Sequence, residues 1–217
     1  MEAGLYLIPV NLSDGDLEDV LPRRNFDVVR SIRHFIVENE RTARRFLKKC
    51  DKAIDIDSLT FYPLNEHTRP EETVHYLDAL AQGEPMGVIS EAGCPAVADP
   101  GADVVAMAQR RGFKVVPLVG PSSILLSLMA SGFNGQSFAF QGYLPIDGGQ
   151  TQIFIETPYR NNRLIAELAK ALRRDLRLCV AYDITGADEW IATRTIAEWE
   201  KNQPTLAKKP AIFLLYK

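Results

Sequence analysis

One stretch of the sequence, residues 87–127, constrains the fold more than any other. It begins with a short apolar run at 87–90 and continues into a loop at 91–101 that holds two glycines, two prolines and two carboxylates. Apolar residues at helical spacing over 102–111 are followed by a second apolar run at 113–119. Gly120-Pro121-Ser122-Ser123 then opens another apolar helix. This order predicts a parallel β-α-β crossover with a helix after it.

The two Gly/Pro-rich loops of this unit are expected at the carboxyl ends of parallel strands. Ligands of open α/β sheets bind at that edge, and small residues there let a ligand approach the backbone closely. Ser122 and Ser123 stand where a helix begins and offers free N–H groups. Either loop by itself could be a tight turn and nothing more. Two such loops on consecutive strands favour a binding site.

Periodicity along the rest of the chain predicts further elements. The expected strands lie at 4–10, 35–37, 59–64, 138–144, 153–155, 178–182, 190–192 and 211–216, and the expected helices at 27–33, 43–49, 71–82 and 163–174. Charged residues 38–42, directly after a predicted strand, either line a substrate cleft or cap the next helix. The basic helical patch of Arg44, Arg45, Lys48 and Lys49 is either a solvated face or a contact for RNA phosphates.

Composition limits the class of protein. A chain of 217 residues with 46% hydrophobic residues suits one large or two small domains. The cysteines Cys50, Cys94 and Cys179 are widely spaced, which favours a reducing compartment. The three histidines have no metal-ligand spacing, so no metal is expected. The net charge of −3 argues against a broad basic face for nucleic acid but leaves room for a local one.

No signal peptide and no membrane span are expected. The apolar run at residues 5–10 is too short for either, and no stretch approaches the roughly 20 apolar residues of a spanning helix. These features predict a soluble, cytoplasmic protein. The first strand is followed by no G-x-G-x-x-G pattern, which argues against a dinucleotide oxidoreductase.

The central motifs resemble those of a known enzyme superfamily. SEAGCPAVADPG at 90–101, followed by VVPLVGPSS at 115–123, is similar to the tetrapyrrole methylase superfamily, the class III S-adenosylmethionine-dependent methyltransferases. The closest branch is the ribosomal small subunit methyltransferase I type, with S-D-A-G-T-P-x-x-x-D-P-G in the first loop. Glu91 replaces its Asp and Cys94 its Thr. IFIETPYR at 153–160 is similar to the branch's I-F-Y-E-S-P-H-R.

The resemblance implies a fold and an activity. We expect an N-terminal α/β domain at 1–119, with a mostly parallel sheet and flanking helices, and a C-terminal α/β domain at 120–217 with a mixed sheet. S-adenosylmethionine would bind in a cleft between them. The implied reaction is methylation of a ribose 2′-hydroxyl in small-subunit ribosomal RNA, and the implied assembly is a homodimer.

The resemblance also implies which residues form the cofactor wall. Free backbone N–H and C=O groups in Gly/Pro loops can bind the carboxylate, amine, ribose and adenine edge of the cofactor. The expected wall consists of Pro9, Glu91, Ala92, Gly93, Cys94, Ser122, Ser123, Ile124, Glu156, Thr157, Pro210 and Ala211.

The residue that removes the proton from a hydroxyl acceptor is left open. Glu40, Glu156 and Asp183 are candidates from position alone, and Arg41 or Arg160 could instead anchor a phosphate. No catalytic residue is assigned.

Two departures from the branch keep other functions open. Gly186 stands where the branch has a lysine, and the link at 145–153 replaces a longer basic segment. One alternative is therefore a methyltransferase acting on a small, tetrapyrrole-like molecule or a protein side chain. The other is a non-catalytic protein that binds S-adenosylmethionine.

Overall fold

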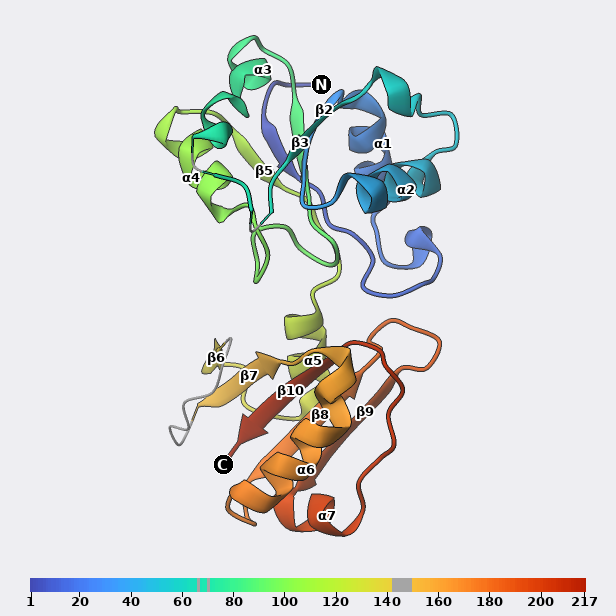
Figure 1. Ribbon diagram of the computed structural model, residues 1–217, viewed down its shortest axis with the longest axis vertical. Coiled ribbons are helices and arrows are strands. Elements are labelled where there is room, and N and C mark those ends of the chain that lie inside the picture. The colour runs from blue at the N-terminus through green and yellow to red at the C-terminus, as the bar shows by residue number, and fades with distance from the viewer. Residues whose placement is uncertain (66, 70, 142–149) are drawn as a thin grey trace. The chain divides into compact units, whose positions relative to one another are not determined.

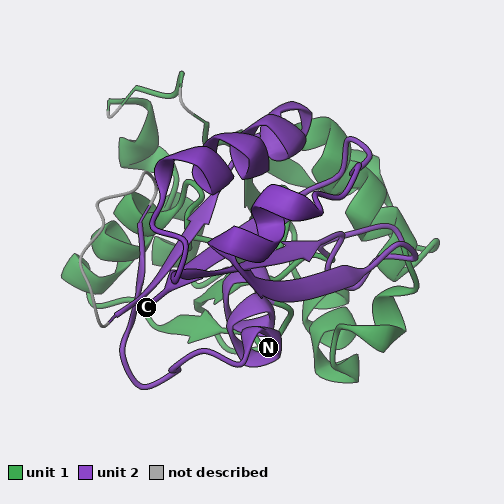
Figure 2. Ribbon diagram, turned by 90° about the horizontal axis from the view of Figure 1, so that it is seen from below, with its two compact units in different colours: residues 1–11, 15–121 green, residues 12–14, 122–217 purple. Residues whose placement is uncertain are grey.

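The computed structural model describes residues 1–65, 67–69, 71–141 and 150–217 (Figure 1). The chain forms two compact units, coloured separately in Figure 2. Unit 1 consists of residues 1–11 and 15–121, and unit 2 of residues 12–14 and 122–217. These units are defined by contacts, so the domain boundary between residues 119 and 120 stays a prediction.

Unit 1 is built on a five-stranded sheet whose strands all run parallel, as expected. Its order is β3-β2-β4-β1-β5. The strands are β1 (Leu5–Leu7), β2 (His34–Val37), β3 (Thr60–Pro63), β4 (Met86–Ile89) and β5 (Val115–Pro117). The carboxyl ends of all five strands therefore lie at one edge of this sheet.

Helices cover both faces of the unit-1 sheet, which explains why its central strands are apolar throughout. Along β2, Phe35 and Val37 face one core cluster and Ile36 faces the other. The first cluster packs under α1 (Arg23–Ser31) and α2 (Glu40–Cys50). The second packs under α3 (Asp78–Ala81) and α4 (Ala102–Arg110). Short 3₁₀ turns lie at Leu17–Asp19, Ile56–Ser58 and Glu72–His75.

Two helix predictions in unit 1 differ from the structure. The single helix expected at 71–82 is a 3₁₀ turn at Glu72–His75 and the short α3, because the backbone of Leu77 leaves helical geometry between them. Buried Tyr76 donates its hydroxyl hydrogen to the carbonyl of Pro63, and this contact holds the break in place. The helix expected at 27–33 begins earlier, directly after Pro22, and ends at Ser31.

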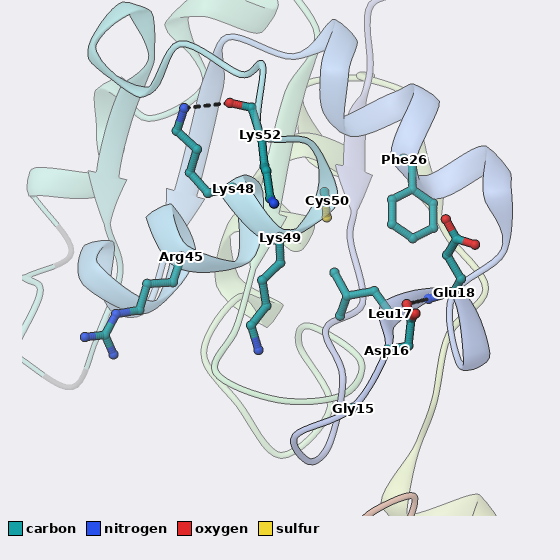
Figure 3. Close-up of a pocket in the computed structure, with 10 residues that line it drawn as sticks. All are labelled: Gly15, Asp16, Leu17, Glu18, Phe26, Arg45, Lys48, Lys49, Cys50 and Lys52. Carbon is teal, nitrogen blue, oxygen red and sulfur yellow. Dashed lines mark hydrogen bonds between the residues drawn. The ribbon is translucent and has the colours of Figure 1, made fainter.

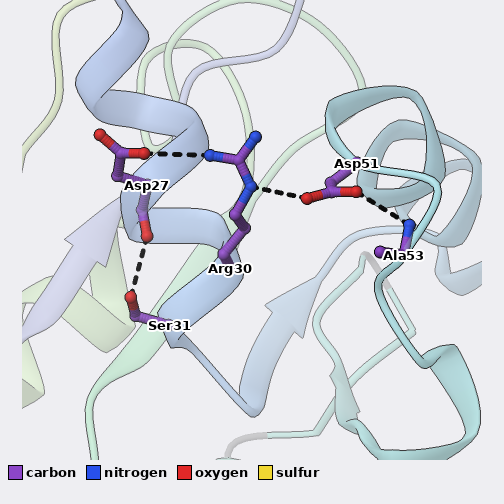
Figure 4. Close-up of polar contacts among 5 residues, drawn as sticks. All are labelled: Asp27, Arg30, Ser31, Asp51 and Ala53. Atoms are coloured by element: carbon purple, nitrogen blue, oxygen red, sulfur yellow. Dashed lines mark hydrogen bonds and ion pairs between the residues drawn. The ribbon is translucent and has the colours of Figure 1, made fainter.

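A polar network joins the end of α2 to α1 (Figure 4). Arg30 on α1 donates from Nη1 to Asp27 at 3.0 Å and from Nε to Asp51 at 2.7 Å. The second carboxylate oxygen of Asp51 accepts from the N–H of Ala53 at 2.8 Å. The Ala53 N–H and Arg30 lower the pKa of Asp51, so the carboxyl stays ionised and fixes the chain where α2 ends.

Unit 2 contains the mixed sheet that was expected, in the order β6-β7-β10-β8-β9. The strands β6 (Phe138–Phe140) and β7 (Thr151–Ile155) pair in parallel. The last strand, β10 (Ala211–Tyr216), runs antiparallel to β7 and to β8 (Arg177–Tyr182), and β9 (Trp190–Thr195) runs antiparallel to β8. The strand expected at 138–144 ends at Phe140, and residues 142–149, with most of the 145–153 link, lie outside the described residues.

Both faces of the unit-2 sheet are also covered (Figure 1). On one face, α5 (Ser123–Ser131) packs through Leu128 in a cluster that includes Leu214. On the other face, α6 (Asn161–Ala171) and α7 (Ile196–Lys201) pack through Ile165 and Trp199. The sequence analysis did not predict α7, which begins with a capping box between Thr195 and Glu198.

Candidate functional site

The predicted residues of unit 1 meet at the carboxyl edge of its sheet. After β1, Val10 pairs with Gly93 of the loop after β4: Val10 N donates to Gly93 O at 2.9 Å, and Gly93 N donates to Val10 O at 3.1 Å. Pro9 packs directly on Gly120, because a Cβ on Gly120 would lie 2.2 Å from Pro9 Cβ. The structure thus brings the ends of β1, β4 and β5 into one surface.

The loop after β4 has a strained backbone. Gly93, Ala96, Ala98 and Gly101 all have positive φ, at 69°, 64°, 62° and 130°. Alanine adopts this region rarely and at a cost of roughly 1 kcal/mol or more, so the surrounding contacts must hold the loop in shape. Such strain is typical of functional loops. Exposed Glu91 and Ala92 begin this loop and present their backbone to solvent.

Cys94 has a structural role in this loop. Its Sγ donates to the carbonyl oxygen of Pro121 at 3.4 Å and so joins the two Gly/Pro loops within unit 1. Burial raises the pKa of the thiol. Cys94 is therefore a neutral packing group, not a nucleophile.

A carboxylate cluster, made of Glu38, Glu91 and Asp99, lies at the ends of the neighbouring strands β2 and β4. Glu38 accepts a hydrogen bond from the Glu91 N–H at 3.3 Å, and Thr42 donates its hydroxyl hydrogen to Glu91. Burial first, and then the charge of Asp99, raises the pKa of Glu38. Burial, and then the charge of Glu91, raises the pKa of Asp99. Burial is thus the main cause of both raised pKa values, and repulsion between the carboxylates adds to it.

A buried hydroxyl adjoins this cluster. Ser90, 5% exposed at the end of β4, lies near enough to Asp99 to lower the pKa of that carboxyl, which partly offsets the rise. The contact falls short of hydrogen-bond geometry, and Ser90 Oγ has no other partner within the described part of the chain. An orphaned buried hydroxyl beside carboxylates marks a place where a ligand can supply the missing bond.

The predicted residues of unit 2 meet at one edge of the second sheet. Glu156 and Thr157 follow β7. Ala211 begins β10, which runs antiparallel beside β7, and Pro210 directly precedes it. Glu156 accepts from the Thr157 N–H at 2.8 Å and pairs with Arg160 at 3.4 Å. The Thr157 side chain does not cap the 3₁₀ turn that follows.

Ser122, Ser123 and Ile124 begin α5 in unit 2, as the sequence predicted. Ser122 has extended backbone, and its Oγ accepts from the Leu125 N–H at 3.4 Å. It is thus the N-cap, which leaves N–H groups of the first turn available to an acceptor.

A second charged cluster lies at the unit-2 edge. Lys209, just before β10, places Nζ 2.7 Å from Asp183 Oδ2 and 2.9 Å from Asp188 Oδ2. Asp183 is buried, and its Oδ2 also accepts from the Asp188 N–H at 3.0 Å. Hydrogen bonds to both carboxylates raise the pKa of Lys209. Asp183 therefore organises the loop that follows β8.

The three candidates for a base named from the sequence are all engaged in local contacts. Glu40 pairs with Arg44 at 2.5 Å on the surface of α2, and Glu156 pairs with Arg160. Asp183 is held by Lys209. Arg41 is exposed in the first turn of α2.

The sequence placed Glu38 only among the charged residues 38–42, which either line a cleft or cap a helix, and it did not mark Asp99 or Lys209 as site residues. The signal for Glu38 is its position: it follows β2 as directly as Ser90 follows β4, and adjacent parallel strands bring such residues together. The pairing of Lys209 with Asp183 had no local signal, because it depends on β10 lying beside β8.

The described residues contain no group of three or more metal-ligating side chains placed to hold a metal ion. In the same part of the chain, no helix is both long and apolar enough to cross a membrane.

The chemistry of the unit-1 edge fits S-adenosylmethionine, which carries a positive sulfonium and an ammonium group. The carboxylate cluster supplies negative charge, Ser90 supplies an orphaned hydroxyl, and Glu91 and Ala92 are exposed beside them. The cleft between the two units stays a prediction, because each unit is described by itself.

Comparison with curated proteins decides the family. The chain is 30% identical over 207 residues to ribosomal RNA small subunit methyltransferase I of Vibrio cholerae serotype O1, a match that covers 89% of this chain and 69% of the relative. The chain belongs to the ribosomal RNA small subunit methyltransferase I family. The enzyme of the same name from Pseudomonas aeruginosa is 28% identical over 211 residues, which cover 91% of this chain and 72% of the relative.

Solved structures show the same fold at lower identity. Uroporphyrin-III-C-methyltransferase from Thermus thermophilus matches with a TM-score of 0.61 at 15% identity, covering 99% of this chain and 94% of that one. A complex of such an enzyme with S-adenosyl homocysteine matches with a TM-score of 0.59 at 17% identity, covering 98% and 92%. No family model matches the chain. The methyltransferase family and its fold, both expected from the motifs, are confirmed.

Proposed function

We propose that this chain is an S-adenosylmethionine-dependent methyltransferase that methylates a ribose 2′-hydroxyl of small-subunit ribosomal RNA. The observation that carries the proposal is the 30% identity over 89% of the chain to a relative named for small-subunit ribosomal RNA methylation. The carboxylate cluster and the strained loop beside it support the cofactor assignment. When bound, the cofactor supplies an electrophilic methyl group on a sulfonium.

The residues of unit 1 have two tasks in this proposal. Backbone groups at 91–93 orient the cofactor, and the carboxylate cluster favours its positive charge. Glu38 and Asp99 have a raised pKa, which moves a carboxyl toward the range in which it can accept a proton from a hydroxyl. We therefore propose that these two, ahead of Glu40, Glu156 and Asp183, are the candidates for that proton transfer.

In unit 2, Ser122–Ile124, Glu156-Thr157 and Pro210-Ala211 remain the proposed cofactor residues. The support for this is local: they lie at the first turn of α5 and at one edge of the sheet, where backbone groups are available.

The deciding experiment follows methyl transfer directly. The purified chain is incubated with methyl-labelled S-adenosylmethionine and small ribosomal subunits or their RNA from cells that lack the gene. We expect label in RNA, with one ribose linkage that resists alkali because its 2′-hydroxyl is methylated. Label only in protein or small molecules would overturn the RNA assignment and keep the methyltransferase. Cofactor binding without label in any fraction would favour a binding protein.

The cofactor residues are tested by calorimetry with S-adenosyl homocysteine. Glu38→Gln removes a charge from the cluster and is expected to weaken binding roughly 10- to 100-fold, the range for a charged hydrogen bond. Glu84→Gln, an exposed acid before β4, is the matched control and should bind like the wild type. Equal affinity of both variants would remove the cluster from the cofactor site.

We also propose a homodimer and a cytoplasmic location. The resemblance to dimeric methyltransferases supports the first, and a ribosomal substrate supports the second. Light scattering on the eluted protein tests the dimer: a mass near 24.2 kDa at all concentrations would contradict it.

A further inference from the structure

A cavity of about 660 Å³ opens in unit 1 between α2 and the loop that leads into the first 3₁₀ turn (Figure 3). None of the predicted cofactor residues lines it, but Arg45, Lys48 and Lys49 of the basic helical patch do. Its lining, which we call the cationic pocket, consists of Gly15, Asp16, Leu17, Glu18, Phe26, Arg45, Lys48, Lys49, Cys50 and Lys52.

Four cations make one wall of the cationic pocket. Arg45, Lys48 and Lys49 lie on one face of α2 at helical spacing, and Lys52 follows the end of the helix. Lys49 extends toward the loop at Gly15 (Figure 3). Within the described part of the chain, Arg45, Lys48 and Lys52 make no ion pair, whereas the neighbouring Arg44 pairs with Glu40. The Lys48 ammonium donates to the Lys52 carbonyl at 3.0 Å, so these side chains keep their positive charge without a direct carboxylate contact, on a protein whose net charge is −3.

Apolar and neutral groups line another part of the pocket. Leu17 and Phe26 belong to the hydrophobic core and present their remaining surface here. Burial raises the pKa of Cys50 to about 12, so its thiol is neutral at physiological pH. Leu17 and Phe26 are only 5% and 9% exposed, so the pocket offers a cation wall beside a largely buried apolar floor.

The two acids of the pocket do not cancel its cation wall. Asp16 accepts from the Glu18 N–H at 3.0 Å and thereby caps the 3₁₀ turn at Leu17–Asp19. Neither acid forms an ion pair with Arg45, Lys48 or Lys52 among the contacts of the described residues. Their carboxylates remain available as hydrogen-bond acceptors.

Helix stability explains only part of this arrangement. Cations in the last turn of a helix interact favourably with its dipole, by about 0.3–1 kcal/mol each, which accounts for Lys48 and Lys49. It does not account for Lys52, which lies beyond the helix end, or for the hollow that all four cations share.

We propose that the cationic pocket binds the phosphodiester backbone of a single-stranded segment of the RNA substrate. Lysines bind phosphates as point charges and hold a strand without reading its sequence. An unpaired segment can enter the hollow whose floor includes Leu17 and Phe26, which a duplex cannot do. The inference rests on the proposed function, and it assigns the RNA a contact outside the cofactor site.

The test measures how salt changes RNA affinity. The probe is a short single-stranded RNA from the small ribosomal subunit, added to the full chain with S-adenosyl homocysteine. Each phosphate contact on a single strand contributes about 0.7 to the slope of log affinity against log salt concentration. The triple variant Lys48→Gln, Lys49→Gln, Lys52→Gln is expected to bind more weakly, with a slope reduced by up to about 2.

A matched triple variant controls for net charge. Arg110→Gln, Lys170→Gln and Lys201→Gln remove the same charge from exposed positions outside the pocket. This control should keep the wild-type slope, and urea midpoints should show that both variants fold. Both should also bind S-adenosyl homocysteine like the wild type.

Each outcome separates the inference from the proposed function. If the wild type methylates RNA and the pocket variant keeps its affinity and slope, the inference is overturned and the function stands. If both triple variants lose affinity equally, only general charge matters, and the inference is again overturned. If the pocket variant loses affinity for anionic lipid vesicles but keeps its affinity for RNA, the inference is overturned and the pocket is assigned to a membrane surface. If the wild type methylates no RNA yet binds it through the pocket, the reaction proposed above fails and the pocket inference is supported.

Discussion

Gly186 leaves the space that the carboxylate of Asp183 fills. A Cβ on Gly186 would lie 2.3 Å from Asp183 Oδ2 and 2.4 Å from its Cγ. The pattern that the chain resembles has a lysine at this position. In this chain Lys209 Nζ lies 2.7 Å from Asp183 Oδ2. A side chain at residue 186 would therefore compete for space with the carboxylate that Lys209 binds.

The first prediction concerns this contact. Gly186→Ala forces the buried Asp183 side chain away from Lys209 and Asp188, and we expect a loss of about 1–3 kcal/mol in the free energy of unfolding. Gly135→Ala in the same unit is the control, because a Cβ there meets nothing within 4 Å. Urea denaturation measures both. Equal urea midpoints for Gly186→Ala and Gly135→Ala would contradict the prediction, because they would show that the Asp183 side chain can move aside without loss of stability.

The second prediction concerns Gly120 and Pro9. A Cβ on Gly120 would meet the rigid proline ring at 2.2 Å, so the two loops of unit 1 must separate in Gly120→Ala. We expect a destabilisation of about 1–3 kcal/mol and weaker binding of S-adenosyl homocysteine. Gly15→Ala, which places its Cβ in open space, should change neither quantity. Calorimetry and urea denaturation provide the two readouts, and unchanged cofactor affinity would exclude this contact from the cofactor wall.

The third prediction is a pH dependence that comes from Asp99. The pKa of Asp99 is higher in the folded protein than in the unfolded chain, where it is about 4. Its contribution to the free energy of unfolding is therefore fully present below that pH and is lost as the pH rises through the pKa of the folded protein. Asp99→Asn cannot ionise, and it also removes a charge that raises the pKa of Glu38. We expect a higher urea midpoint than wild type at pH 7 and a gain that shrinks on acidification. A gain that is the same at pH 7 and pH 4 would contradict this assignment.

The fourth prediction uses the orphaned hydroxyl of Ser90. Without a ligand, Ser90→Ala removes no hydrogen bond of the described residues, so the free energy of unfolding should change by no more than about 0.5 kcal/mol. With S-adenosyl homocysteine present, the variant should gain less thermal stability than the wild type if the ligand bonds to this hydroxyl. Identical ligand-induced shifts in the melting temperature would show that it does not.

The fifth prediction concerns the segment that carries Lys209. Asn161 on α6 is buried and donates from Nδ2 to the Lys209 carbonyl at 2.9 Å. Asn161→Ala leaves that carbonyl unpaired and should cost about 1–3 kcal/mol. Hydrogen exchange should then quicken across residues 203–210. The neighbouring Asn162 exchanges two hydrogen bonds with Leu206, so Asn162→Ala should quicken exchange near Leu206 with a smaller loss of stability. Exchange that stays at the wild-type rate in Asn161→Ala would contradict this role.

The parts of the fold that the sequence predicted well are those with strong local signals. The β-α-β unit at 87–127 has apolar runs separated by glycine and proline, and its strands and helices form where expected. The helix expected at 71–82 failed because burial of Tyr76 and Leu77 overrode helical spacing. The missed helix α7 is only six residues long, but its Thr195–Glu198 capping box was a readable signal.

The site was predictable where a motif marked it. The loops around Gly93 and Gly120 were recognised from residue type and order, and the structure places both at the carboxyl edge of the unit-1 sheet. The carboxylate cluster was harder to predict, since it joins Glu38 and Asp99, two residues 61 positions apart by their numbers, through the pairing of β2 with β4. Lys209 and Asp183 likewise meet only because β10 pairs with β8.

The strand order of unit 1 has a consequence for synthesis on the ribosome. The first strand made, β1, lies inside the sheet and pairs only with β4 and β5. While residues 8–85 are being added, neither strand that pairs with β1 has been made. The backbone N–H and C=O groups along both edges of β1 are then open to pairing with other chains. The carboxyl edge that holds Pro9, Gly93 and Gly120 can form only when residue 120 has left the exit tunnel. A truncated chain that ends before β5 would therefore keep Pro9 and residues 91–94 but lack Gly120 and the proposed cofactor residues of unit 2.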